Sequence, residues 1–202
     1  MIANVNSHFS QNPPRADIQR SKFSRPQKHI TTFSAGKLIP VYIDEVLPGD
    51  TFSIRPSVLC RMSTPIFPVM DDCFLDLYAF FSPDRLLWER FQEFMGENKT
   101  APWFNEQNAN LKIPSITDGL SEGQTTQIPT GSVGDYLGLP VGVNIPADEQ
   151  ISDLPFRMYQ LIWNEFFRSE NVNTPVLVNL GSTGSDTVAK GLPYSAAREE
   201  HH

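Results

Sequence analysis

The chain has 202 residues, with 16 Lys or Arg against 23 Asp or Glu, so its formal net charge is −7 and its pI is about 5.0. Hydrophobic residues make up 40%, which excludes a disordered chain, while 17 prolines and 12 glycines disfavour a bundle of long helices. No apolar run reaches the roughly 18 residues that a bilayer crossing needs, and the N-terminus lacks a signal-peptide pattern. We therefore expect no membrane insertion and no export.

Residues 1–37 form a basic arm, in which six Lys or Arg against one Asp give a charge of +5 and leave −12 for the rest of the chain. Such an arm can hold a polyanion, because each cation that neutralises a phosphate releases a counterion. The candidate nucleic-acid-binding residues are Arg15, Arg20, Lys22, Arg25 and Lys28. A solvated tail lying on a neighbouring surface explains the charge equally well, so both interpretations stay open.

Three strands are predicted next. Residues 38–46 form a weak strand, a Pro48-Gly49 turn follows, and residues 51–62 form a strong strand because their apolar side chains alternate. Its two faces are Phe52, Ile54, Pro56, Val58, Cys60 and Met62 on one side and Thr51, Ser53, Arg55, Ser57, Leu59 and Arg61 on the other. Residues 73–81, with only Asp76 polar, predict a central strand covered on both faces.

Three helices are predicted. One begins at a Ser82 cap and ends at Gly96, a short one spans residues 132–137, and a long one spans residues 154–170. The long helix should bury more than half of its girth, on a stripe made of Met158, Leu161, Ile162 and Phe166 and widened by Tyr159, Trp163 and Phe167.

Less structure is predicted for the rest of the chain. Residues 98–150 show no convincing strand, so we expect an excursion outside the core or against a partner. Residues 176–180 predict a short strand, and residues 191–202 read as a polar tail.

The chemistry that the sequence offers is sparse. All four histidines, His8, His29, His201 and His202, lie in the terminal segments, so we expect no catalytic residue, metal site or cofactor. Cys60 and Cys73 are expected to be buried thiols. Asp71, Asp72 and Asp76 leave a two-carboxylate hydrolase as an alternative, although Asp71 and Asp72 are more simply turn residues. The high aromatic content favours a self-assembling protein over an enzyme.

Four stretches resemble the major capsid protein of the Microviridae, most closely its gokushovirus branch. They are residues 40–52 (PVYIDEVLPGDTF), 64–97 (TPIFPVMDDCFLDLYAFFSPDRLLWERFQEFMGE), 131–140 (GSVGDYLGLP) and 154–171 (LPFRMYQLIWNEFFRSEN). Their order and spacing match as well. The resemblance implies a mainly β protein, a viral jelly-roll β-sandwich with helical and loop insertions, here incomplete. Residues 51–62 and 73–81 would be its first two strands, in opposite sheets, with the helices outside and packed against neighbours.

The resemblance also implies a function. Sixty copies would form an icosahedral shell around circular single-stranded DNA, together with other virion or internal scaffolding proteins, in a phage that recognises a bacterial host surface and assembles in the host cytoplasm. The protein would be no enzyme. Residues 38–190 would form the N-terminal part of the jelly-roll domain, with residues 98–150 inserted, and residues 191–202 would mark a truncation or frameshift. A single-stranded DNA-binding module that does not assemble is the alternative.

Overall fold

The computed structural model describes residues 19–97 and 111–196. The chain divides into two units, residues 1–30 and residues 31–202. Every described residue of the first unit is exposed and without regular secondary structure. Residues 31–37, the last part of the predicted basic arm, belong to the second unit. Thr32 accepts a hydrogen bond from the Tyr136 hydroxyl at 3.1 Å, and Lys37 forms an antiparallel bridge with Ser195.

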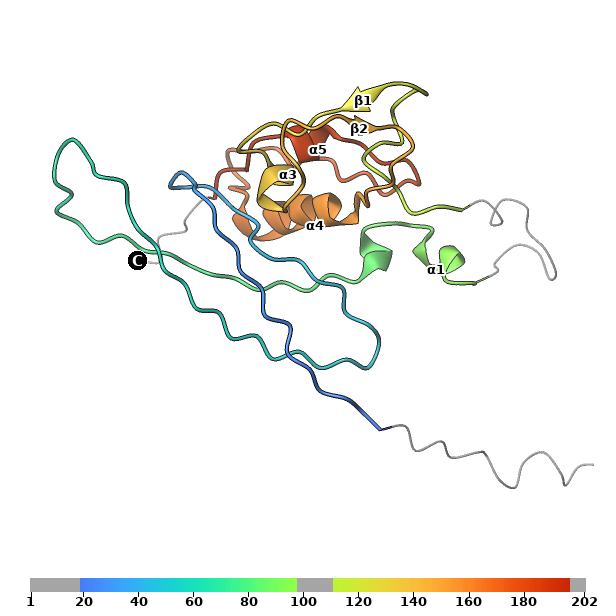
Figure 1. Ribbon diagram of the computed structural model, residues 1–202, viewed down its shortest axis with the longest axis horizontal. Coiled ribbons are helices and arrows are strands. Elements are labelled where there is room, and N and C mark those ends of the chain that lie inside the picture. The colour runs from blue at the N-terminus through green and yellow to red at the C-terminus, as the bar shows by residue number, and fades with distance from the viewer. Residues whose placement is uncertain (1–18, 98–110, 197–202) are drawn as a thin grey trace, which may run out of the picture. The chain divides into compact units, whose positions relative to one another are not determined.

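The core of the second unit surrounds one helix, α4 (Leu154–Ile162), which continues into the π-helix η3 (Trp163–Phe167). Figure 1 shows α4 beneath a two-stranded antiparallel sheet, β1 (Thr125–Thr126) and β2 (Ile145–Pro146), and two one-turn helices, α3 (Val133–Tyr136) and α5 (Thr187–Lys190). The buried apolar cluster comprises Ile116, Ile128, Val133, Ile145, Phe156, Tyr159 and Ala189. The long predicted helix is thus confirmed over all but its last three residues.

The core draws heavily on residues 111–150, a stretch that we expected to lie outside it. Four members of the apolar cluster come from this stretch, and it also supplies both strands of the small sheet. The prediction was wrong because the isoleucines are isolated among polar residues and so show no periodicity. They enter the core from separate short elements instead: Ile116 from a turn, Ile128 from an isolated bridge and Ile145 from β2.

The buried stripe of α4 also differs from the predicted one. Phe156, Tyr159 and Trp163 are buried, whereas Phe166 is 66% exposed. The two amphipathic rings can be buried because their polar atoms have partners: the Tyr159 hydroxyl donates to the Leu38 carbonyl at 3.0 Å, and the Trp163 indole donates to the Ser195 carbonyl at 2.8 Å. Burial raises the pKa of the Tyr159 phenol, so it remains a hydrogen-bond donor.

The helix predicted over residues 82–96 is broken in two. A 3₁₀ helix, η2, spans Asp84–Leu86, and a single α-helical turn, α1, spans Phe91–Phe94. Between them the Glu89 amide donates to the Leu180 carbonyl at 3.1 Å, rather than to a carbonyl one turn back in the helix. A tertiary contact with a distant segment therefore overrides the local helical pattern.

The short helix predicted over residues 132–137 forms as α3, and Ser132 caps it, since its side chain accepts a hydrogen bond from the Asp135 amide. The predicted cap at Ser82 does not form, and the N-cap position of η2 is taken by Pro83. Within residues 19–97 and 111–196, the buried Ser82 hydroxyl has no hydrogen-bond partner.

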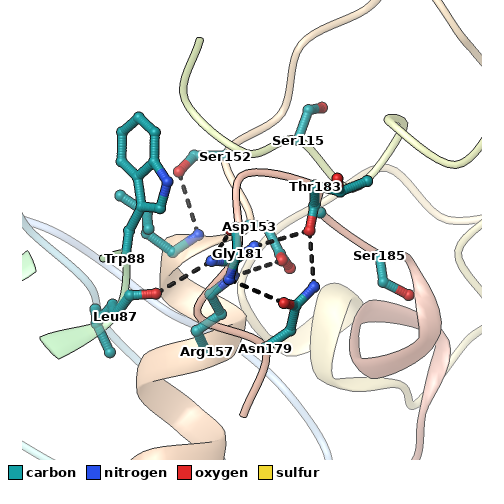
Figure 2. Close-up of polar contacts among 12 residues, drawn as sticks. Leu87, Trp88, Ser115, Ser152, Asp153, Arg157, Asn179, Gly181, Thr183 and Ser185 are labelled. Atoms are coloured by element: carbon teal, nitrogen blue, oxygen red, sulfur yellow. Dashed lines mark hydrogen bonds and ion pairs between the residues drawn. The ribbon is translucent and has the colours of Figure 1, made fainter. Parts of the chain in front are cut away.

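A buried arginine joins α4 to two distant segments, as Figure 2 shows. Arg157 is 1% exposed, and its Nε donates to the Asp153 carboxylate at 2.9 Å. Its Nη1 donates to the carbonyls of Leu87 (3.1 Å) and Gly181 (2.8 Å), and its Nη2 donates to Thr183 (3.0 Å). We call these residues the arginine clamp.

The Asp153 carboxylate of the arginine clamp is buried. Burial raises the pKa of Asp153, and the hydrogen bond and charge of Arg157 offset part of that effect. The rigid fork of the guanidinium also suits carbonyls that approach from two different segments. The clamp therefore fixes the backbone after η2 and the loop at residues 181–183 to the same helix.

The loop after residues 181–183 also packs closely against backbone at Ser115. A side chain at Gly184 would place its Cβ 2.0 Å from the Ser115 carbonyl oxygen. The Asp118 carboxylate joins these two backbones, because it accepts hydrogen bonds from the amides of Ser115 (2.7 Å) and Gly184 (2.9 Å). Only glycine fits this position.

We predict that Gly184→Ala destabilises the fold by roughly 3 kcal/mol, because the added methyl group displaces backbone rather than a flexible side chain. The urea midpoint of unfolding measures the effect. Gly119→Ala is the matched control, since a Cβ there meets nothing within 4 Å. Equal midpoints for the two variants would contradict the packing described here.

We predict that Arg157→Leu lowers the free energy of unfolding by about 3–5 kcal/mol, because it removes the charged donor of the buried Asp153 carboxylate. The Leu87 and Gly181 carbonyls lose their donor as well, while the Thr183 carbonyl keeps the Asn179 side-chain amide. Lys190→Ala removes a second i,i+4 ion pair, with Asp186, in which the lysine side chain is 40% exposed. That control should cost less than about 1 kcal/mol. A similar loss in both variants would show that the clamp is not special.

Candidate assembly surface

Residues 51–62 and 73–81 carry a large exposed apolar surface. Both segments run extended, as predicted, but neither forms a strand, and Figure 1 draws them without arrows. Their large apolar side chains are exposed: Phe52, Ile54, Val58, Leu59, Met62, Phe74, Leu75, Leu77, Tyr78 and Phe81. Residues 38–46 and 176–180 likewise lack a ladder. The four strand predictions are therefore wrong for this chain by itself, because a strand requires a hydrogen-bonded neighbour.

Residues 73–81 are anchored to the core by aromatic contacts on one face only. The rings of Phe80 and Phe166 lie 4.9 Å apart, and those of Tyr78 and Phe167 lie 5.4 Å apart. Both contacts use even-numbered positions of the segment, so Tyr78 and Phe80 touch η3, although Tyr78 (59%) and Phe74 (69%) on that face stay largely exposed. The odd-numbered face, which includes Leu75, Leu77 and Phe81, remains exposed.

The exposed faces of the two segments meet at one point. The Cys73 thiol lies 3.7 Å from the Met62 sulfur, and both residues belong to the faces that carry most of the exposed apolar side chains. Cys60 lies on the same face as Met62. Both cysteines are free thiols and both are exposed, so the prediction of buried thiols is wrong for this chain alone. They are exposed because no part of the chain that the structure describes covers these faces.

The turn before residues 51–62 forms as predicted. The Asp50 amide donates to the Leu47 carbonyl at 3.0 Å, and Gly49 adopts a φ of 88°, which favours glycine. Acidic groups approach one another nearby: burial, and then the charge of Glu45, raises the pKa of Asp84.

The candidate nucleic-acid-binding residues lie in the first unit. Arg20, Lys22, Arg25 and Lys28 are exposed, and residues 19–30 contain no acidic residue. Arg15 lies outside the described residues. The structure therefore describes four cations on an extended stretch of backbone, without a fixed pocket around them.

The acidic residues considered for hydrolysis form no enclosed site. Asp71 accepts a hydrogen bond from the amide of Asp72 at 2.9 Å, which is a turn contact, and Asp76 is exposed on its segment. A cavity of about 560 Å³ beside α4 is lined by other residues, among them Asp153, Arg157, Gln160 and Tyr194. Across residues 19–97 and 111–196, no group of three His, Cys, Asp or Glu could hold a metal ion.

No described helix has the length and hydrophobicity that a bilayer crossing requires.

Sequence reasoning missed the arginine clamp, because an arginine four residues after an aspartate usually marks an exposed helical pair. It also missed the role of the adjacent pair Phe166 and Phe167 in anchoring residues 73–81. Two consecutive aromatic residues after a buried helix were the only local signal of that role.

Comparison with known proteins identifies relatives of this chain. The family described as capsid protein (F protein) matches residues 11–201. The capsid protein VP1 of Chlamydia phage 1 is 39% identical over 182 residues, covering 88% of this chain and 28% of that protein. VP1 of Bdellovibrio phage phiMH2K is 35% identical, covering 96% of this chain and 34% of that protein, and VP1 of Spiroplasma virus 4 is 33% identical, covering 89% and 32%.

The chain thus spans about a third of the length of these curated relatives. The resemblance to the Microviridae is confirmed, since the matching relatives are capsid proteins of phages in that group. The matched region includes the exposed segments, the helices and the arginine clamp. The chain therefore belongs to the capsid protein (F protein) family.

Proposed function

We propose that this chain is part of a capsid subunit that assembles with copies of itself into an icosahedral shell of sixty copies around circular single-stranded DNA, in a phage virion assembled in the bacterial cytoplasm. The observation that carries this proposal is the exposed apolar surface of residues 51–62 and 73–81, in a chain that belongs to a capsid family. Exposed apolar surface of this extent is typical of a surface that another protein covers.

The contacts of these segments support a jelly-roll sandwich as the completed fold. Tyr78 and Phe80, on the even face of residues 73–81, contact η3, which would place the helix outside the sandwich. The odd face would then point inward, toward the apolar face of residues 51–62. The contact between Cys73 and Met62 joins these two inward faces, as expected for neighbouring strands in opposite sheets.

Residues 51–62 and 73–81 also need backbone partners. Extended backbone that is buried must pair its N–H and C=O groups, and the ladders of a sandwich are the usual solution. In the proposal, further capsid sequence supplies these ladders. An enzymatic role gains no support from the site, because the three candidate aspartates line no described cavity.

The basic segment is proposed to face the genome. Arg20, Lys22, Arg25 and Lys28 give residues 19–30 a charge of +4 without an acid, whereas the rest of the chain is acidic. Cations on an extended segment can follow a flexible phosphate backbone without reading its sequence. Other virion or internal scaffolding proteins and the host surface are further proposed partners.

We predict that the thiols of Cys60 and Cys73 react rapidly with a maleimide in the isolated chain, because both are exposed. In particles assembled from a capsid protein that carries this sequence, the same thiols should be protected, because the inward faces are covered. Mass spectrometry measures the labelled fraction. A cysteine introduced by Glu122→Cys, at an exposed loop position, is the control and should react in the particles if it lies on their surface. Rapid labelling of Cys60 and Cys73 in intact particles would contradict the proposed sandwich.

We predict that changing Arg20, Lys22, Arg25 and Lys28 together to Ala weakens binding to single-stranded DNA. The slope of log affinity against log salt should fall by up to about 0.7 for each phosphate that is no longer neutralised. Fluorescence anisotropy with a labelled oligonucleotide measures both quantities. Lys112→Ala, which removes an exposed cation from the acidic unit, is the control. An unchanged salt slope in the fourfold variant would assign the basic segment to protein contacts.

A further inference from the structure

One face of residues 51–62 is basic and would remain outside the proposed sandwich. By alternation this face carries Arg55, Leu59 and Arg61, opposite the apolar face that is expected to point inward. Leu59 is 99% exposed, and it lies between the two arginines. Neither arginine forms an ion pair in the structure, as far as residues 19–97 and 111–196 are described. The face thus presents one apolar side chain flanked by two cations.

Acidic residues stand close in sequence to the rings that join residues 73–81 to η3. Asp76 and Tyr78 share the even face of that segment, and Glu165 and Phe166 come from η3. All four are exposed, and Phe166 is 66% exposed although it contacts Phe80. Within the described part of the chain, neither acid has an ion-pair partner. We call these four residues the acidic aromatic patch.

The two surfaces complement each other in charge and in kind. Leu59 matches the exposed ring of Phe166, and the two arginines match the two acids, while a guanidinium can also stack on an aromatic ring. We propose that the basic face of residues 51–62 in one copy binds the acidic aromatic patch of a second copy. This inference rests on the proposed self-assembly and names the contact through which it occurs.

The arrangement fits a closed shell rather than a simple pair. In the proposed sandwich the two surfaces lie on opposite sheets, so each copy presents the basic face on one side and the acidic aromatic patch on the other. A contact between two different surfaces is heterologous, and its repetition produces rings where the rotation closes. A protein partner is favoured over DNA because the central contact is apolar and the receiving patch is acidic.

The test uses two charge-reversed forms of the full chain, Arg55→Glu with Arg61→Glu, and Asp76→Lys with Glu165→Lys. Each form alone presents like charges to itself, so its self-association measured by sedimentation velocity should weaken roughly tenfold or more. An equal mixture restores opposite charges in both directions and should recover the association of the unmodified chain within about threefold. Glu122→Lys with Asp148→Lys, at exposed acids elsewhere, is the matched control and should associate normally.

The mixture keeps the result interpretable, because a variant that fails to fold cannot be rescued by a second variant. Unweakened association of either reversed form, or failure of the folded forms to associate when mixed, would overturn this contact while leaving the proposed capsid role intact. Folding is checked by far-ultraviolet circular dichroism. An unmodified chain that stays monomeric at every concentration would instead count against the proposed self-assembly. Weakening of DNA binding by Arg55→Glu with Arg61→Glu, without any change in association, would assign the basic face to nucleic acid.

Discussion

The structure depends on one constraint: extended, apolar backbone is stable only when a neighbour pairs its amides and covers its side chains. The residues of the buried cluster around α4 meet this constraint within the chain, through turns, one-turn helices and a two-residue ladder. Residues 51–62 and 73–81 do not meet it, and their side chains are exposed. In the proposed capsid subunit, contacts with further sequence would complete these residues.

The arginine clamp connects the satisfied part of the chain to the unsatisfied part. Arg157 donates to the carbonyl of Leu87, which lies shortly after residues 73–81 in the sequence. The rings of residues 73–81 contact η3. The segment at residues 73–81 is therefore fixed at one end and on one face, while its other face stays open to a partner. Such an arrangement holds the exposed face in a defined orientation, which would limit the entropy lost if a partner covers it as proposed.

Local signals predicted what local interactions determine. A short helix forms within residues 132–137, Gly49 adopts the positive φ of its turn, and the long helix lies where its aromatic residues indicated. The alternation at residues 51–62 predicted extended backbone correctly, but a ladder depends on a partner that no local pattern reveals. Isolated residues such as Ile116 and Ile128 joined the core without periodicity, and Arg157 became buried through carbonyls far away in the sequence. These features arise from contacts between residues far apart in the sequence, and local sequence patterns do not predict such contacts.

Amide hydrogen exchange tests the central claim most directly, because it reports whether backbone N–H groups are paired. The account predicts that residues 73–81 exchange without protection in the isolated chain, while the amides of α4 are protected, and that both become protected in assembled particles. Strong protection of residues 73–81 in a monomeric, isolated chain would contradict it, since the segment would then be complete without any partner.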